Sequence, residues 1–161
     1  MPVTDVTKDL ESRTITVTSE FAAPVDRVWQ IWEDPRQLER WWGPPTHPAT
    51  FTDHDLTPGA RVKYYMTGPD GEVYPGYWDI TEVAKPSRLA YDDGFADADG
   101  EPQESAPVGS STVDLLATDS GTQMVMTATY PTAEDLQKVL DMGMEEGITQ
   151  AVNQVDALLA A

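Results

Sequence analysis

The longest helical pattern of this sequence is T-A-E-D-L-Q-K-V-L-D-M-G-M-E-E-G-I-T-Q-A-V-N-Q-V-D-A-L-L, residues 132–159. Its apolar and small residues recur at intervals of three and four, which predicts one continuous helix with a single buried face. Thr132 can cap the first turn, and Asp135 partly imitates the acidic partner of a capping box. A stripe of this length must be covered by a sheet face. It comprises Leu136, Val139, Leu140, Gly143, Met144, Gly147, Ile148, Ala151, Val152, Val155, Leu158 and Leu159.

The chain before this helix alternates short extended runs with turn residues. Separators such as Thr57-Pro58-Gly59 and Asp119-Ser120-Gly121 suit turns for steric reasons. The pattern predicts an antiparallel meander of six strands, at residues 50–55, 60–67, 72–83, 88–92, 111–118 and 122–130. Residues 94–109 are rich in Asp, Ala, Pro and Glu, and we expect them to form an exposed loop.

The N-terminal part predicts one further strand and two short helices. Residues 13–21 show a period of two, with Ile15, Val17 and Phe21 on one face, which is typical of a half-buried strand. Pro24 suits the first turn of a helix that carries Val25, Val28, Trp29 and Trp32. Asp34 can cap a second helix, started by Pro35, that bears Leu38, Trp41 and Trp42. The predicted fold is therefore α+β, in the order strand, two helices, six strands, long helix.

Length and charge limit the function classes. A chain of 161 residues fits one domain, with a core over about residues 13–159. The net charge of -18 disfavours nucleic acid, because that partner requires Lys and Arg on its phosphates. The acidic residues are scattered, which favours a solvated surface over a docking site for a basic protein partner. With no cysteine, no signal-like N-terminus and no apolar run long enough to span a bilayer, we expect a cytoplasmic protein without membrane contact.

Four stretches of the sequence resemble one known superfamily. They are F-A-A-P-V-D-R-V-W-Q-I-W-E-D-P (21–35), L-E-R-W-W-G-P (38–44), L-T-P-G-A-R-V-K-Y-Y-M (56–66) and G-Y-W-D-I-T-E-V-A-K-P-S-R-L-A-Y (76–91). With the element order, they are similar to the START-like, or SRPBCC, superfamily, and to its branch resembling the C-terminal domain of the activator of the heat-shock protein 90 ATPase. The resemblance implies a helix-grip fold, in which a curved antiparallel sheet wraps around the C-terminal helix. It also implies an internal cavity that often takes an apolar ligand, but no single activity, since the superfamily includes carriers, receptors and cyclases.

Tryptophan, glycine and methionine supply the candidate cavity. Four of the five tryptophans lie between Trp29 and Trp42; core packing is favoured for the first pair, whereas Trp41 and Trp42 lie where a cavity mouth would be. Gly143 and Gly147 each destabilise a helix by about 0.5–1 kcal/mol relative to alanine, so they serve either close strand approach or ligand space. The candidate ligand-binding residues are Trp32, Trp41, Trp42, Tyr64, Met66, Trp78, Arg88, Tyr91, Met126, Gly143, Met144 and Gly147.

Catalytic and cofactor motifs are weak. His47 and His54 are the two histidines, and strand alternation turns Asp53 and Asp55 away from His54. We therefore expect no catalytic residue, no metal and no cofactor, and the segments that bear glycine match no phosphate or dinucleotide motif. Arg88 fits a solvated strand edge, with a ligand carboxylate as the alternative partner. The leading hypothesis is binding of a small apolar or aromatic molecule; the alternatives are a protein-interaction module, or a cyclase- or hydrolase-type enzyme that uses His54 and Arg88.

Overall fold

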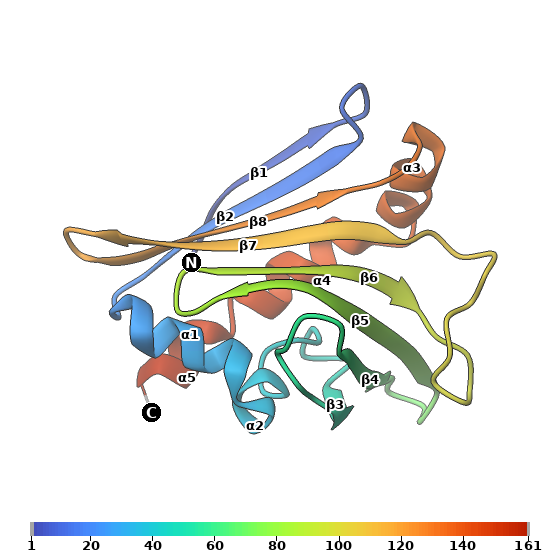
Figure 1. Ribbon diagram of the computed structural model, residues 1–161, viewed down its shortest axis with the longest axis horizontal. Coiled ribbons are helices and arrows are strands. Elements are labelled where there is room, and N and C mark those ends of the chain that lie inside the picture. Colours follow the sequence, from blue (N-terminus) through green and yellow to red (C-terminus); the bar gives the residue numbers. More distant parts are fainter. Residues whose placement is uncertain (1, 161) are drawn as a thin grey trace.

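The computed structural model describes residues 2–160, which form one antiparallel sheet flanked by helices (Figure 1). The eight strands lie in the order β1-β2-β8-β7-β6-β5-β4-β3, so that the pairing of β2 with β8 joins the two N-terminal strands to the last strand of the chain. Their bounds are β1 Val3–Asp9, β2 Thr14–Phe21, β3 Ala49–Asp53, β4 Arg61–Thr67, β5 Val73–Ala84, β6 Arg88–Phe95, β7 Gly109–Thr118 and β8 Gly121–Thr129.

All seven predicted strands are present, and β1 was not predicted. The side chains of β1 are mostly exposed, and only Val3 and Val6 are half-buried. A register shift between Val3 and Asp5 also breaks the alternation along the strand. Because an edge strand of this kind buries little, its sequence lacks the period of two that identifies β2.

The two short helices between β2 and β3 follow their predicted boundaries in part. Helix α1 (Val25–Glu33) buries Val28, Trp29, Ile31 and Trp32. Helix α2 (Pro35–Leu38) is capped by Asp34, whose side chain accepts a hydrogen bond from the Arg36 backbone N–H at 2.9 Å. It ends before Trp41 and Trp42, which lie in the following turn and not on the helix.

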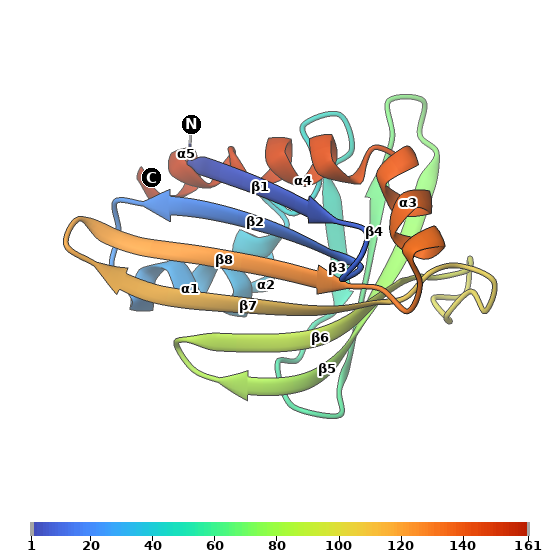
Figure 2. The ribbon, with the colours of Figure 1, turned by 90° about the horizontal axis from the view of Figure 1, so that it is seen from above.

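The C-terminal helical region is broken twice, which corrects the prediction of one continuous helix. It consists of α3 (Ala133–Asp141), α4 (Met144–Val152) and α5 (Val155–Ala160), which run in succession along one side of the sheet (Figure 2). Thr132 caps α3 as expected, accepting the Asp135 N–H at 3.0 Å. The first break occurs because Gly143 adopts a left-handed φ of 88°. None of the helices within residues 2–160 is long and apolar enough to cross a membrane.

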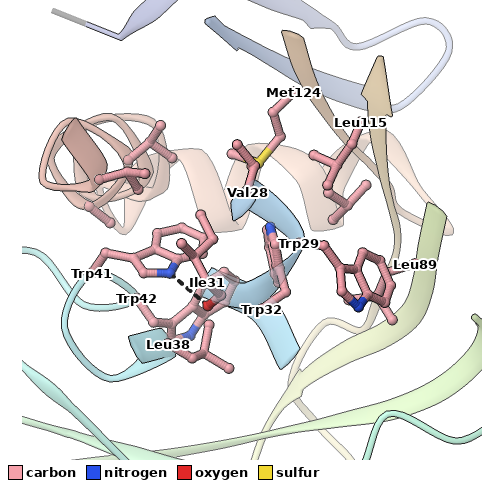
Figure 3. Close-up of a cluster of buried hydrophobic side chains, with 14 of the residues drawn as sticks. Val28, Trp29, Ile31, Trp32, Leu38, Trp41, Trp42, Leu89, Leu115 and Met124 are labelled. Atoms are coloured by element: carbon pink, nitrogen blue, oxygen red, sulfur yellow. Dashed lines mark hydrogen bonds between the residues drawn. The ribbon is translucent and has the colours of Figure 1, made fainter. Parts of the chain in front are cut away.

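The buried side chains form two clusters. The larger joins α1, the tryptophans and α5 to the inner face of the sheet, with Trp29, Trp32, Trp41 and Trp78 at most 1% exposed (Figure 3). Trp41 donates its indole N–H to the Ile31 carbonyl at 3.1 Å. The smaller cluster joins α3 to the other end of the sheet through Ile15, Tyr130, Leu136 and Val139. The hydrophobic interior therefore consists of two clusters, one toward each end of the sheet.

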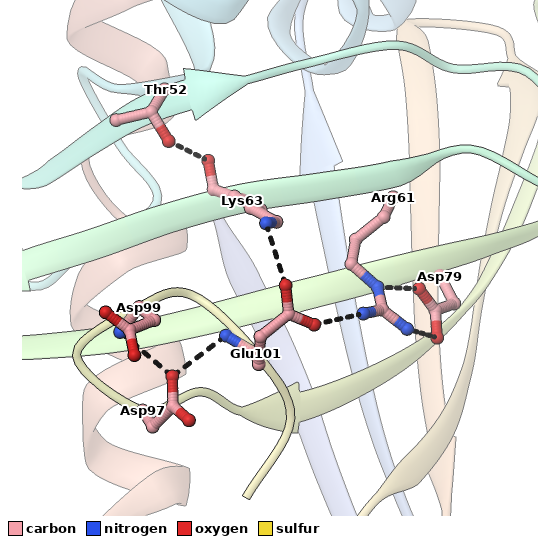
Figure 4. Close-up of polar contacts among 7 residues, drawn as sticks. All are labelled: Thr52, Arg61, Lys63, Asp79, Asp97, Asp99 and Glu101. Carbon is pink, nitrogen blue, oxygen red and sulfur yellow. Dashed lines mark hydrogen bonds and ion pairs between the residues drawn. The ribbon is translucent and has the colours of Figure 1, made fainter.

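The outer face of the sheet carries part of the β6–β7 loop, residues 96–108, which is shorter than the predicted 94–109 because Gly94 and Phe95 belong to β6 and Gly109 to β7. Arg61 forms a two-pronged ion pair with Asp79, at 2.7 and 3.1 Å (Figure 4). Glu101, in the loop, lies 3.3 Å from Arg61 and 3.6 Å from Lys63. These contacts attach the Glu101 end of the loop to β4 and β5 on the outer face, whereas Pro107 of the same loop reaches the concave side.

Candidate functional site

A cavity of about 480 Å³ opens on the concave side of the sheet, between the two hydrophobic clusters. Helices α3 and α4 form one wall, and strands β4, β5 and β6 form the other. The exposed side chains of Tyr74 and Met142 lie at its rim. Its lining is made of Trp42, Pro44, Thr46, His47, Tyr64, Met66, Tyr74, Pro75, Gly76, Asp93, Gly94, Phe95, Pro107, Tyr130, Val139, Met142, Gly143, Met144, Glu146, Gly147, Ile148 and Gln150.

The cavity exists because side chains are missing from its helical wall. A methyl group built at Gly143 or at Gly147 meets no atom within 4 Å. These glycines therefore do not serve close packing against a strand, which was one of their two predicted roles. Ala151, one turn further on, is 1% exposed and does pack in the larger cluster. On the helical wall, the cavity therefore lies beside Gly143 and Gly147 and ends before Ala151.

The two glycines should respond oppositely to substitution by alanine. Gly147→Ala should raise the free energy of unfolding by about 0.5–1 kcal/mol, because its backbone is helical and the added methyl has room. Gly143→Ala should lower it by about 1–2 kcal/mol, because a Cβ disfavours the left-handed φ of 88°. Urea denaturation of both variants measures the difference, and shifts of the same sign would contradict it.

The sheet wall of the cavity is aromatic, and glycines make room for its rings. A Cβ at Gly76 would lie 2.6 Å from the Tyr64 hydroxyl, and one at Gly109 would lie 2.8 Å from the Tyr130 ring. Tyr64 stacks on Phe51 at 5.0 Å and meets Trp42 edge-on at 6.1 Å between ring centroids. Both tyrosine rings are therefore held flat against the sheet by residues on neighbouring strands.

One carboxyl group, that of Asp93, lines the cavity from β6. Burial raises the pKa of Asp93 to about 7, and the nearby Tyr64 hydroxyl acts in the opposite direction as a hydrogen-bond donor. Burial likewise raises the pKa of Tyr64 well above its usual value, against the effect of the indole N–H groups of Trp42 and Trp78. Neither indole N–H has a hydrogen-bond partner at standard geometry. The wall therefore offers one buried carboxyl group with the Tyr64 hydroxyl close to it.

Half of the predicted ligand-binding residues line this cavity. Trp42, Tyr64, Met66, Gly143, Met144 and Gly147 do so. Trp32, Trp41 and Trp78 are fully buried and Tyr91 is 2% exposed, so these four rings support the wall from behind. Met126 packs against the larger cluster. The aromatic side chains of the concave face pack mainly on one another, and of the predicted rings Trp42 and Tyr64 border the cavity.

Arg88 and His54 are remote from the cavity. Arg88 lies at the start of β6 and pairs with Asp114 at 2.8 Å and with Glu82 at 3.2 Å. These acids, led by Asp114, raise the pKa of Arg88. The side chain is on the opposite face from Leu89, as strand alternation requires. His54 places Nε2 2.9 Å from the Trp32 carbonyl oxygen, which is a structural contact.

Asp93, Tyr130 and Glu146 line the cavity but were not predicted to do so. The predicted strand ended at Asp92, whereas β6 continues to Phe95. Continued alternation from Leu89 through Tyr91 brings Asp93 and Phe95 to the concave face. The sequence signal for Asp93 was therefore its position two residues after Tyr91, on the same face of the strand as the buried aromatic side chains.

A second depression, also of about 480 Å³, lies at the other end of the sheet. It is lined by the N-terminal turn of α1 and the β7–β8 turn, and comprises Ala22, Ala23, Pro24, Val25, Asp26, Ala117, Thr118, Ser120 and Gly121. It has no aromatic wall and is shallow, so it is the poorer candidate. Among residues 2–160, no group of three or more His, Asp or Glu side chains could hold a metal ion.

The eight-stranded antiparallel sheet with helices along its concave face defines the helix-grip class of the START-like, or SRPBCC, superfamily. Within that class, residues 22–160 match the family described as activator of Hsp90 ATPase homolog 1-like protein, and the chain belongs to this family. The resemblance drawn from the sequence is confirmed. No protein of curated function matches the chain.

Solved structures of bacterial proteins are similar over nearly the whole chain. Protein Ms6760 from Mycobacterium smegmatis is 57% identical, with a TM-score of 0.91, over 98% of this chain and 97% of that one. A protein from Arthrobacter aurescens is 49% identical, with a TM-score of 0.94, over 98% and 92% of the two chains. A Silicibacter pomeroyi protein described as AHSA1 is 21% identical, with a TM-score of 0.69, over 91% and 97%, and shows the fold alone.

Proposed function

We propose that this protein binds a small apolar or aromatic molecule in the cavity between α3, α4 and the concave face of the sheet. The observation that carries the proposal is a space of about 480 Å³ bordered by Trp42, Tyr64, Met66 and Met144. Sites for small molecules are concave, largely apolar and a few hundred Å³ in volume. Methionine adds an adaptable surface that suits ligands of varied shape.

The free space on the helical wall also depends on a glycine at a position where helix propensity favours alanine. Gly147 lies within α4, where alanine would favour the helix and would meet no atom. A role in packing does not account for this glycine, whereas an occupant of the cavity does. The buried indoles of Trp42 and Trp78 lie against the same wall, so that occupation of the cavity would change their fluorescence.

Filling the cavity tests the proposal. Gly147→Leu should reduce binding of apolar aromatic probes, such as naphthylmethanol, by about tenfold or more, because its side chain occupies the space of the ligand. Ala157→Leu adds the same side chain at an exposed position of α5 outside the cavity and should leave binding unchanged. Binding is followed by calorimetry and by ligand-induced rise in melting temperature. Equal binding by both variants would contradict the proposal.

A protein partner is the second candidate, because the matched family is described by activation of the Hsp90 ATPase. A partner that docks on the acidic outer surface would not sense the side chain at Gly147. Gly147→Leu should then leave ATPase stimulation unchanged, whereas a salt increase should weaken the contact by screening. Loss of small-molecule binding with partner binding retained would separate the two functions.

A further inference from the structure

We infer that the preferred occupant of the cavity is a molecule with an apolar or aromatic body and a basic nitrogen, which pairs with the Asp93 carboxylate. This inference rests on the proposed function and specifies its ligand class. Its basis is the charge of the lining, the position of Asp93 and the aromatic rings around it.

The charged groups that border the cavity have one sign. Asp93 and Glu146 are acidic, and among the described residues of the lining none is lysine or arginine. His47 lies at the edge, with its Nδ1 2.7 Å from the Thr46 hydroxyl. A ligand carboxylate or phosphate would enter without a guanidinium or ammonium partner, and burying an unpaired charge is unfavourable. The lining therefore selects against anions.

Asp93 has no counterion of its own. The two basic side chains of β4 are engaged on the outer face, where Arg61 pairs with Asp79 and Lys63 with Glu101. Within residues 2–160, no ion pair includes Asp93. Its pKa is raised chiefly by burial, with no cation to lower it. A ligand ammonium would supply the charge that the protein omits.

The rings around Asp93 also suit a cation. Tyr64 on β4, Tyr130 after β8 and Phe95 on β6 border the same space, and Trp42 borders it beside Tyr64. The faces of aromatic rings attract ammonium groups, and the attraction is larger where water is excluded. The remaining wall, made of Met66, Met144 and Ile148, would take the apolar body of the ligand.

Binding of such an amine should depend on pH. The titratable groups that face or influence Asp93 are Tyr64 from β4, Tyr91 on its own strand, Tyr130 beyond β8, Glu146 from α4 and His47 at the rim. Burial raises the pKa of Asp93 itself to about 7. An amine that requires the carboxylate should bind about tenfold or more tightly at about pH 8 than at about pH 5.5, because Asp93 must lose its proton.

The test compares three probes of one shape: naphthylmethylamine, naphthylmethanol and naphthoate. Calorimetry at about 0.15 M salt, which screens the general attraction of an acidic protein for cations, measures their affinities. The amine should bind about tenfold or more tightly than the alcohol, consistent with about 1.5–3 kcal/mol for a hydrogen bond to a charged group. Naphthoate should bind least.

Two matched variants identify the carboxylate. Asp93→Asn should abolish the preference for the amine while the alcohol still binds. Asp92→Asn removes the same charge from the neighbouring residue, which accepts a hydrogen bond from Ser110 outside the cavity, and should keep the preference. If the alcohol or naphthoate binds as tightly as the amine, or if Asp93→Asn keeps the preference, this inference is overturned and the proposed function stands. If none of the probes binds the wild-type protein, both are overturned.

Discussion

Replacing Trp32 with alanine is expected to lower the free energy of unfolding by about 3–5 kcal/mol. Trp32 is fully buried on α1. Its ring lies 4.9 Å from Trp41, 5.8 Å from Trp42 and 5.9 Å from Trp78, measured between centroids. Alanine would leave a cavity among rings that are held by the turn after α2 and by β5 and cannot collapse together. Urea denaturation with circular dichroism measures the loss.

Two further substitutions are controls for this expectation. Trp32→Phe keeps an aromatic ring and removes an indole N–H that has no hydrogen-bond partner, so it should lose less than the alanine variant. Leu116→Ala, at a side chain 52% exposed on β7, should change stability by about 0.5 kcal/mol or less. A loss at Trp32→Ala no larger than that at Leu116→Ala would show that the tryptophan cluster is not the stabilising core.

Asp93 should make the ligand-free protein less stable as pH rises. Burial raises the pKa of Asp93 in the folded state to about 7, from an ordinary value of 3.8. The folded state therefore holds a proton that the unfolded state releases between about pH 4 and pH 7, so stability decreases across this window and the full loss is present above it. At about 1.4 kcal/mol for each pKa unit the loss is at most about 4 kcal/mol, reduced by the opening of the cavity to solvent.

The measurement is the free energy of unfolding of three proteins at about pH 5 and pH 8. Asp93→Asn should lose less stability over this interval than the wild-type protein, because asparagine does not titrate. Asp92→Asn carries the same change in net charge and should follow the wild-type protein. Parallel curves for wild type and Asp93→Asn would show that the carboxyl at position 93 ionises as easily in the folded as in the unfolded chain.

Local patterns predicted most elements of this fold, and the misses have local causes. β2 was readable because Ile15, Val17 and Phe21 alternate with exposed residues. β1 was not, since its side chains are mostly exposed and only Val3 and Val6 are half-buried. The break between α3 and α4 was missed because the apolar stripe continues in step through Gly143. The left-handed φ of that residue leaves no mark on the spacing of its neighbours.

The cavity was less predictable than the fold, because it depends on which strands are neighbours. Gly76 makes room for Tyr64 across the β4–β5 pair, a relation fixed by register and not by sequence distance. The sequence identified aromatic residues but could not separate Trp42, which borders the space, from Trp32 and Trp78, which support it. Predicting Asp93 in the cavity required the true end of β6 at Phe95, three residues beyond the predicted end at Asp92.

The division of the interior into two clusters bears on how this family can diversify. Most of the buried aromatic area belongs to the larger cluster, whose side chains are nearly inaccessible. Met66, Met144 and Gly147 border the cavity and are only half-buried. Mutations at Met144 and Gly147 would alter the volume and polarity of the cavity while leaving the larger cluster intact, whereas Met66 also packs against that cluster. If the cavity binds a ligand as proposed, substitutions at its border would change ligand specificity with little effect on folding.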